Sequence, residues 1–87
     1  MRIEHPPITQ MEQRLAGYWG ELLGLQEIGR EDHFISLGGN SLLATMLANR
    51  LEEDMGIRPT MGELFNTLGE VAALCEQLAQ EQSEAGR

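Results

Sequence analysis

One serine stands out as the residue whose surroundings suggest chemistry. Ser41 lies in the segment Leu-Gly-Gly-Asn-Ser-Leu-Leu at residues 37–43, where two glycines precede two residues that commonly cap helices. The glycines interrupt regular structure, and the apolar run behind Ser41 predicts a helix that begins at or near it. We therefore expect the Ser41 hydroxyl to be exposed at the start of a helix.

Ser41 lacks the neighbours of a catalytic nucleophile. A nucleophile elbow requires Gly-x-Ser-x-Gly, but the residue two positions after Ser41 is Leu43. A triad requires a positioned base and an orienting acid, and only His33 lies near in the sequence. His5, His33 and Cys75 do not have the spacing of metal ligands. The pattern favours a serine that is modified by another protein, with no catalytic residue and no metal in this chain.

The predicted helix at Ser41 also differs from the others in its first turn. Three other predicted helix starts carry the capping-box pattern Thr-x-x-Glu, at residues 9–12, 60–63 and 67–70. Residues 41–44 contain no acid, so the positive end of that helix dipole is free to meet an anion such as a phosphodiester. The alternative is that Asn40 or Ser41 only caps the helix. Gly38 and Gly39 favour a functional role, because glycines let a bulky partner approach the backbone.

The elements that must position Ser41 are predicted to be helices. Apolar residues at helical spacing predict long helices over 10–23, from Ser41 to about Asp54 or Met55, and from the Thr67 cap to about Gln80. A short helix is expected over 61–66. Few β-branched or aromatic residues are present, which favours helices over strands. We predict an all-α four-helix bundle of three longer helices and a short third one.

The 87 residues provide one hydrophobic core, and we place the domain at residues 8–80. Residues 1–7 are expected to form a flexible arm and the polar residues 81–87 a flexible tail. Residues 24–40 form a long connection without helical periodicity. Five apolar side chains are expected to hold it against the core: Leu25, Ile28, Phe34, Ile35 and Leu37.

The composition excludes several kinds of partner. A net charge of −8 opposes binding to nucleic acid and to anionic membranes, and it either favours basic protein partners or only maintains solubility. No stretch approaches the ~20 apolar residues of a membrane span, and the N-terminal residues do not resemble a signal peptide. The lone cysteine fits a reducing compartment. We expect a cytoplasmic monomer.

The segment at residues 32–42, Asp-His-Phe-Ile-Ser-Leu-Gly-Gly-Asn-Ser-Leu, resembles the attachment motif of carrier proteins. It is most similar to the peptidyl carrier (thiolation) domains of nonribosomal peptide synthetases. The aromatic residues of the first helix, the long loop, Leu64-Phe65 and Thr67-Leu68 also stand where that family has them, so the resemblance covers most of the chain.

The resemblance implies a carrier rather than an enzyme. Ser41, flanked by Gly39, Asn40 and Leu42, would accept 4′-phosphopantetheine from coenzyme A through a separate phosphopantetheinyl transferase that uses Mg²⁺. The thiol of this covalent arm would hold an aminoacyl, aryl or peptidyl group as a thioester. The carrier would present that group to adenylation, condensation, thioesterase or tailoring enzymes.

Two residues depart from the family pattern. Asn40 stands where Asp or His is common, so the capping ability is kept while a charge is lost. Ile35 replaces the second aromatic residue of the loop motif, and we expect it to remain a hydrophobic pin.

The type of carrier is indicated by the residues after Ser41. Fatty-acid and many polyketide carriers have Ala-Asp-Ser-Leu and an acidic second helix, whereas here the first acids after Ser41 are at 52–54. This favours a peptidyl or aryl carrier and an apolar partner surface that includes Leu42, Met46 and Met61. An alternative for Met46 and Met61 is that they fill gaps in the core. Two alternatives for the function also stay open: the chain is an acyl carrier of polyketide or fatty-acid type, or it is an unmodified helical interaction protein.

Overall fold

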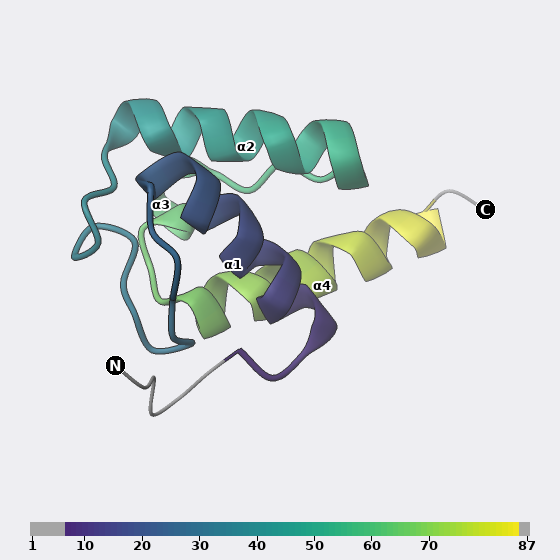
Figure 1. Ribbon diagram of the computed structural model, residues 1–87. Coiled ribbons are helices and arrows are strands. Elements are labelled where there is room, and N and C mark those ends of the chain that lie inside the picture. Colours follow the sequence, from purple (N-terminus) through teal and green to yellow (C-terminus); the bar gives the residue numbers. More distant parts are fainter. Residues whose placement is uncertain (1–6, 86–87) are drawn as a thin grey trace.

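The computed structural model describes residues 7–85, and the regular elements in that range are four helices. They are α1 (Gln10–Leu23), α2 (Ser41–Met55), α3 (Met61–Leu64) and α4 (Leu68–Ala85). Helix α1 packs against both α2 and α4, and the short α3 packs against α2 (Figure 1). The predicted all-α fold with a short third helix is therefore confirmed, and each helix begins where the sequence predicted.

Helix α1 shows how local sequence sets the bounds of an element. The Thr9 hydroxyl accepts the Glu12 N–H and the Glu12 side chain returns to the Thr9 N–H, so the predicted capping box is formed. Gly24 ends the helix in the left-handed conformation, with φ of 72°. Leu15 and Trp19 lie on the apolar face and are fully buried in the core.

Two helix ends differ from the prediction. Helix α3 ends at Leu64 instead of Asn66, because Phe65 leaves helical geometry and Asn66 O accepts the Phe34 N–H. Helix α4 continues to Ala85 instead of ending near Gln80, since residues 81–85 contain no glycine or proline that would break it. The flexibility predicted for the two ends of the chain stays a prediction, because residues 1–6 and 86–87 lie outside the described range.

Two fully buried aromatic rings, Trp19 and Phe34, connect α1 to the long loop, and the partly buried Phe65 packs beside them. Trp19 meets Phe34 edge to face at 5.1 Å between ring centroids, and Phe34 stacks on Phe65 at 6.2 Å. Phe34 is fully buried and Ile28 is nearly so, which confirms that the loop is held against the core.

The pinning role predicted for Ile35 is wrong, because 46% of its surface is exposed. Three hydrogen bonds wind residues 33–39 into a tight turn: Leu37 N–H to His33 O, Gly38 N–H to Ile35 O and Gly39 N–H to Phe34 O. Within this turn the Phe34 side chain fills the core, and the next side chain is directed to solvent. Leu25 is also more exposed than predicted, at 37%.

Candidate functional site

Ser41 is the first residue of α2 and is exposed, as the sequence predicted. Asn40 is the N-cap residue, in extended geometry, and its Oδ1 accepts the Leu43 N–H at 2.9 Å. The carbonyl oxygen of Ser41 accepts the Thr45 hydroxyl at 2.9 Å, while no hydrogen bond within residues 7–85 involves the Ser41 hydroxyl. The hydroxyl therefore stands free at the start of a helix whose first turn is otherwise well fixed.

The backbone beside Ser41 suits an anion. The first intrahelical bond of α2 joins Ala44 N–H to Asn40 O, so the N–H groups of Ser41 and Leu42 precede it and have no acceptor within residues 7–85. No acid lies in the first turn of α2. These two donors and the positive end of the helix dipole make the surroundings of Ser41 fit a phosphodiester.

The two glycines before the cap are required by the geometry of the loop itself. The backbone of Gly38 has a φ of 104°, a value that L-residues with a side chain rarely adopt. A Cβ atom on Gly39 would lie 2.3 Å from Cδ2 of Phe34, so residue 39 can only be glycine against this ring. The sequence analysis explained Gly38 and Gly39 by the need for a partner to approach the backbone, and it did not predict the packing of Gly39 on Phe34. The only sign of this packing in the sequence is the phenylalanine five residues before Gly39.

Backbone hydrogen bonds fasten the long loop to the start of α4. Phe34 N–H donates to Asn66 O at 3.1 Å, Leu68 N–H donates to Asp32 O at 3.0 Å and Gly69 N–H donates to Arg30 O at 2.9 Å. The loop that leads into Ser41 is thus held by α4 on one side and by Phe34 in the core on the other.

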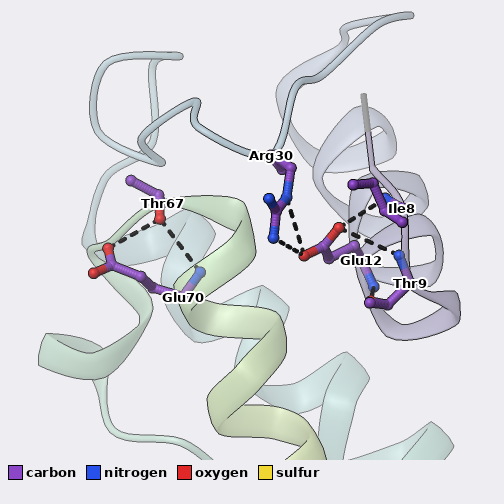
Figure 2. Close-up of polar contacts among 6 residues, drawn as sticks. All are labelled: Ile8, Thr9, Glu12, Arg30, Thr67 and Glu70. Atoms are coloured by element: carbon purple, nitrogen blue, oxygen red, sulfur yellow. Dashed lines mark hydrogen bonds and ion pairs between the residues drawn. The ribbon is translucent and has the colours of Figure 1, made fainter. Parts of the chain in front are cut away.

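An ion pair between the buried Glu12 carboxylate and the partly exposed Arg30 adds a third attachment of the loop, this time to α1. Figure 2 shows the Glu12 carboxylate between Arg30 and the backbone of Ile8 and Thr9. Its Oε2 lies 2.9 Å from Arg30 Nη2, and its Oε1 accepts the Ile8 N–H at 2.7 Å. The Ile8 N–H holds the pKa of Glu12 below its ordinary value, with further help from Arg30 and against the opposing effect of burial. The sequence indicated only the cap for Glu12, because its pairing with Arg30 depends on the tertiary fold.

The predicted capping box at the start of α4 is only half formed. The Thr67 hydroxyl accepts the Glu70 N–H at 3.3 Å, but it also donates to the Glu70 carboxylate at 2.9 Å (Figure 2). The return bond is missing because the Thr67 N–H donates to Asn66 Oδ1 at 3.0 Å instead. The box at residues 60–63 forms in full, as predicted.

Apolar side chains are exposed on the two helices near Ser41. The exposed fractions are 69% for Leu42, 44% for Met46 and 39% for Met61. The alternative that the two methionines fill gaps in the core is therefore wrong. A pocket of about 160 Å³ between α2 and α3 has Met61 on its wall, together with Ala44, Thr45, Leu64 and four further residues.

The thiol of Cys75, unlike the hydroxyl of Ser41, is not accessible for reaction in the folded chain. Cys75 is fully buried on α4, and burial raises the pKa of its thiol to about 11, with smaller contributions from Glu63 and Glu76. The thiolate form is therefore scarce at neutral pH, so Cys75 reacts poorly in the folded chain.

Comparison with known proteins places this arrangement in a family. Residues 13–78 match the family model described as "Phosphopantetheine attachment site". Surfactin synthase subunit 2 of Bacillus subtilis is 38% identical over 82 residues, which is 92% of this chain and 2% of that protein. The solution structure of an active-site mutant of a peptidyl carrier protein matches with a TM-score of 0.83 and 25% identity, and it covers 90% of this chain and 89% of the other.

A further match is the structure of a phosphopantetheine transferase in complex with coenzyme A and a peptidyl carrier protein. Its TM-score is 0.80 at 25% identity, with 84% of this chain and 97% of that chain covered.

The chain therefore belongs to the phosphopantetheine-attachment family. It is a non-catalytic carrier domain of the peptidyl carrier type, and its prosthetic group is 4′-phosphopantetheine. The chain spans about 2% of the length of curated relatives that it matches, among them surfactin synthase and linear gramicidin synthase proteins. None of the helices within residues 7–85 has the length and apolar character needed to cross a membrane.

Proposed function

We propose that Ser41 carries the 4′-phosphopantetheine arm, whose thiol holds an aminoacyl, aryl or peptidyl group as a thioester. One observation carries this proposal: within residues 7–85 the Ser41 hydroxyl and two adjacent backbone N–H groups have no hydrogen-bond partner, and they lie at the end of a loop with three attachments to the fold. The Ser41 Oγ forms the new ester bond to the phosphorus of coenzyme A that bears the pantetheine arm, while the phosphoanhydride bond to that phosphorus breaks and 3′,5′-adenosine bisphosphate leaves. The proton of the Ser41 hydroxyl passes to the transferase, since no base within residues 7–85 is bonded to that hydroxyl.

The residues next to Ser41 have separate roles in this proposal. Asn40 fixes the first turn of α2 through its cap, and Gly39 allows the loop to close on Phe34. The N–H groups of Ser41 and Leu42 face the phosphodiester once it is attached. The first turn of α2 contains no acid, which favours a peptidyl or aryl carrier over an acyl carrier of the fatty-acid type.

Leu42, Met46 and Met61 are proposed as contacts for partner enzymes, because they are large, apolar and exposed near Ser41. Those partners would be adenylation, condensation, thioesterase or tailoring enzymes of nonribosomal peptide synthesis. The relatives that support this are proteins of the gramicidin and surfactin synthases. We further propose that the chain acts as a monomer in the cytoplasm, where the free Cys75 stays reduced.

The proposal is tested by intact mass after incubation with coenzyme A, Mg²⁺ and a broad-specificity phosphopantetheinyl transferase. We expect the wild-type chain and a Ser36→Ala control to gain one phosphopantetheine, and Ser41→Ala to gain none while keeping its helical circular dichroism. A Ser41→Ala chain that is still modified, or a folded wild type that is never modified, would refute the assignment.

A further inference from the structure

The strongly basic side chains of this sequence are all of one kind. The sequence has six such residues, and all six are arginines. Arginine and lysine carry the same charge at neutral pH but differ in reactivity. A guanidinium stays protonated in proteins, whereas a lysine amine has a pKa of about 10.4, so that about 1% of it is a free amine at pH 8.5. The cations of this carrier are therefore the ones that do not attack a thioester.

Reactivity matters here because a thioester on a flexible arm repeatedly meets the surface of its own carrier. A tethered group reaches a site on the same molecule at an effective concentration on the order of millimolar. A free amine on that surface would attack the thioester carbonyl carbon, and a C–N bond would form as the C–S bond breaks. The thiol of the arm would leave with the proton that the nitrogen loses. The acyl group would then stay on the carrier as an amide, out of reach of the partner enzymes.

Arg58 shows where a lysine would be harmful. It lines the pocket of about 160 Å³ between α2 and α3 together with Thr45, which lies one helical turn after Ser41. The Arg58 side chain is 47% exposed, and its Nη1 donates to Glu52 Oε1 at 2.7 Å and to Asn49 Oδ1 at 3.0 Å. A lysine at this position could keep the ion pair, but it would bring an amine to a pocket that begins one turn from the attachment residue.

Other nucleophilic side chains within residues 7–85 are withdrawn from the surface or already bonded. Cys75 is fully buried on α4, so its sulfur is shielded from the arm. His33 is half-buried, and its Nδ1 accepts the Ile35 N–H at 3.2 Å. In the neutral ring the proton is then on Nε2, so the lone pair that could attack a carbonyl is engaged. The Tyr18 hydroxyl is buried and donates to Asp54 Oδ2 at 2.6 Å.

We propose that the surface of this domain protects the carried acyl group from capture by the carrier itself, because its cations are arginines, its thiol is buried and the lone pair of His33 is engaged. This inference rests on the proposed function, since a thioester is present only if Ser41 carries the arm. The acyl group then leaves the thiol only to water or to a partner enzyme.

The test follows the loss of a phenylacetyl group that a transferase loads from phenylacetyl-coenzyme A. The transferase is removed, and the chain is kept at pH 8.5 beside free phenylacetyl-coenzyme A, which measures hydrolysis. Hydroxylamine then cleaves thioesters but leaves amides, so the mass of the chain shows any captured group. We expect the wild type to lose the group within about twofold of the rate of the free thioester, with none retained as an amide.

Two substitutions bring an amine to this surface. Arg58→Lys does so at the pocket, and Met46→Lys does so at a position on α2 that is 44% exposed. We expect both variants to lose the thioester at least about fivefold faster than the wild type, with the phenylacetyl group retained as an amide. Met46→Arg is the matched control, because it places the same charge at the same position without a free amine. Its rate should equal that of the wild type.

Several results would overturn the inference. An amide on the wild type would do so, and so would a wild-type loss much faster than that of the free thioester, which would include an effect of His5, outside the described residues. Wild-type rates in both lysine variants, in chains that keep their helical circular dichroism, would show that an amine on this surface is harmless. Faster loss from Met46→Arg would assign the effect to charge. A wild type that takes up no phenylacetyl-phosphopantetheine refutes the proposed function itself, which separates the two failures.

Discussion

Gly39 lies so close to the Phe34 ring that no side chain fits at this position. An added Cβ would lie 2.3 Å from the ring and 2.7 Å from the Phe34 carbonyl oxygen. Overpacking of this kind costs about 1–3 kcal/mol. We expect Gly39→Ala to lower the free energy of unfolding by that amount and to slow transfer to Ser41, because the loop has to shift. Urea unfolding and transferase kinetics measure the two effects.

Gly17 supplies the control for this prediction. It lies within α1, and an added Cβ would meet no atom within 4 Å. Gly17→Ala is therefore expected to raise the free energy of unfolding by up to about 1 kcal/mol, through helix propensity. Equal effects of the two substitutions would contradict the packing role of Gly39.

Ionisation of Glu12 makes the free energy of unfolding depend on pH. Its pKa is lower in the folded chain than the ordinary value of 4.5, so its charged form stabilises the fold above that value. The contribution is lost as the pH falls through the folded-state pKa. We expect Glu12→Gln to reduce the free energy of unfolding at pH 7 by about 1–3 kcal/mol, and the difference from wild type to shrink below pH 4.5.

Glu21→Gln is the control, since Glu21 pairs with Arg50 at 2.9 Å but is 64% exposed. Solvent screens that exposed pair, so its loss should change the free energy of unfolding only slightly. If Glu12→Gln and Glu21→Gln were equally mild, or if the difference at Glu12 did not depend on pH, the role of Glu12 as an anchor of the loop would be wrong.

Among the helices, α2 depends on a single side-chain cap. Asn40 Oδ1 satisfies the Leu43 N–H, and no acid in the first turn supports it. Asn40→Ala should lower the free energy of unfolding by about 0.5–2 kcal/mol. Asn40→Asp keeps the acceptor and adds a favourable charge, so its stability should stay within about 0.5 kcal/mol of wild type. Thermal unfolding of the three chains decides whether the cap acts in this way.

The helices could be predicted where their causes are local in the sequence. Thr9 with Glu12, and Thr60 with Glu63, form capping boxes whose partners are three residues apart, and Gly24 ends α1 by its own conformation. The predicted capping box at Thr67 is incomplete because the Asn66 side chain, instead of Glu70, accepts the Thr67 N–H. The end of α4 was missed because polar residues were interpreted as a tail, although nothing in residues 81–85 breaks a helix.

For the molecule as a whole, Cys75 reports on global opening of the fold. Its side chain is fully buried and its thiol pKa is raised to about 11, so the native state offers almost no reactive thiolate. We expect alkylation at pH 8 to proceed only through unfolding and to accelerate with urea in step with the unfolded population. A Cys75→Ala chain that carries Ala73→Cys, on the exposed side of α4, should react at once. Rapid alkylation of native Cys75 would contradict this burial.

The candidate site divides into a part that the sequence predicted and a part that only the fold reveals. The exposure predicted for Ser41 at the start of a helix is confirmed by the structure, and of the two interpretations left open for Met46 the exposed one holds. The exposure of Ile35 depends on the tight turn at residues 33–39, and the Glu12–Arg30 pair depends on a contact between distant segments; periodicity and motifs encode neither. Sequence reasoning therefore found the attachment motif and the apolar anchors Phe34 and Ile28, but not the Glu12–Arg30 pair or the backbone bonds to the start of α4.

Attachment of phosphopantetheine to Ser41 is best tested by a site-resolved mass measurement. After incubation with coenzyme A, Mg²⁺ and transferase, the peptide that contains residues 31–50 is fragmented to locate the added group. We predict one phosphopantetheine per chain, with all of the added mass on Ser41. Added mass on Ser36 or Thr45 would contradict this assignment, and so would a folded chain that gains no mass at all.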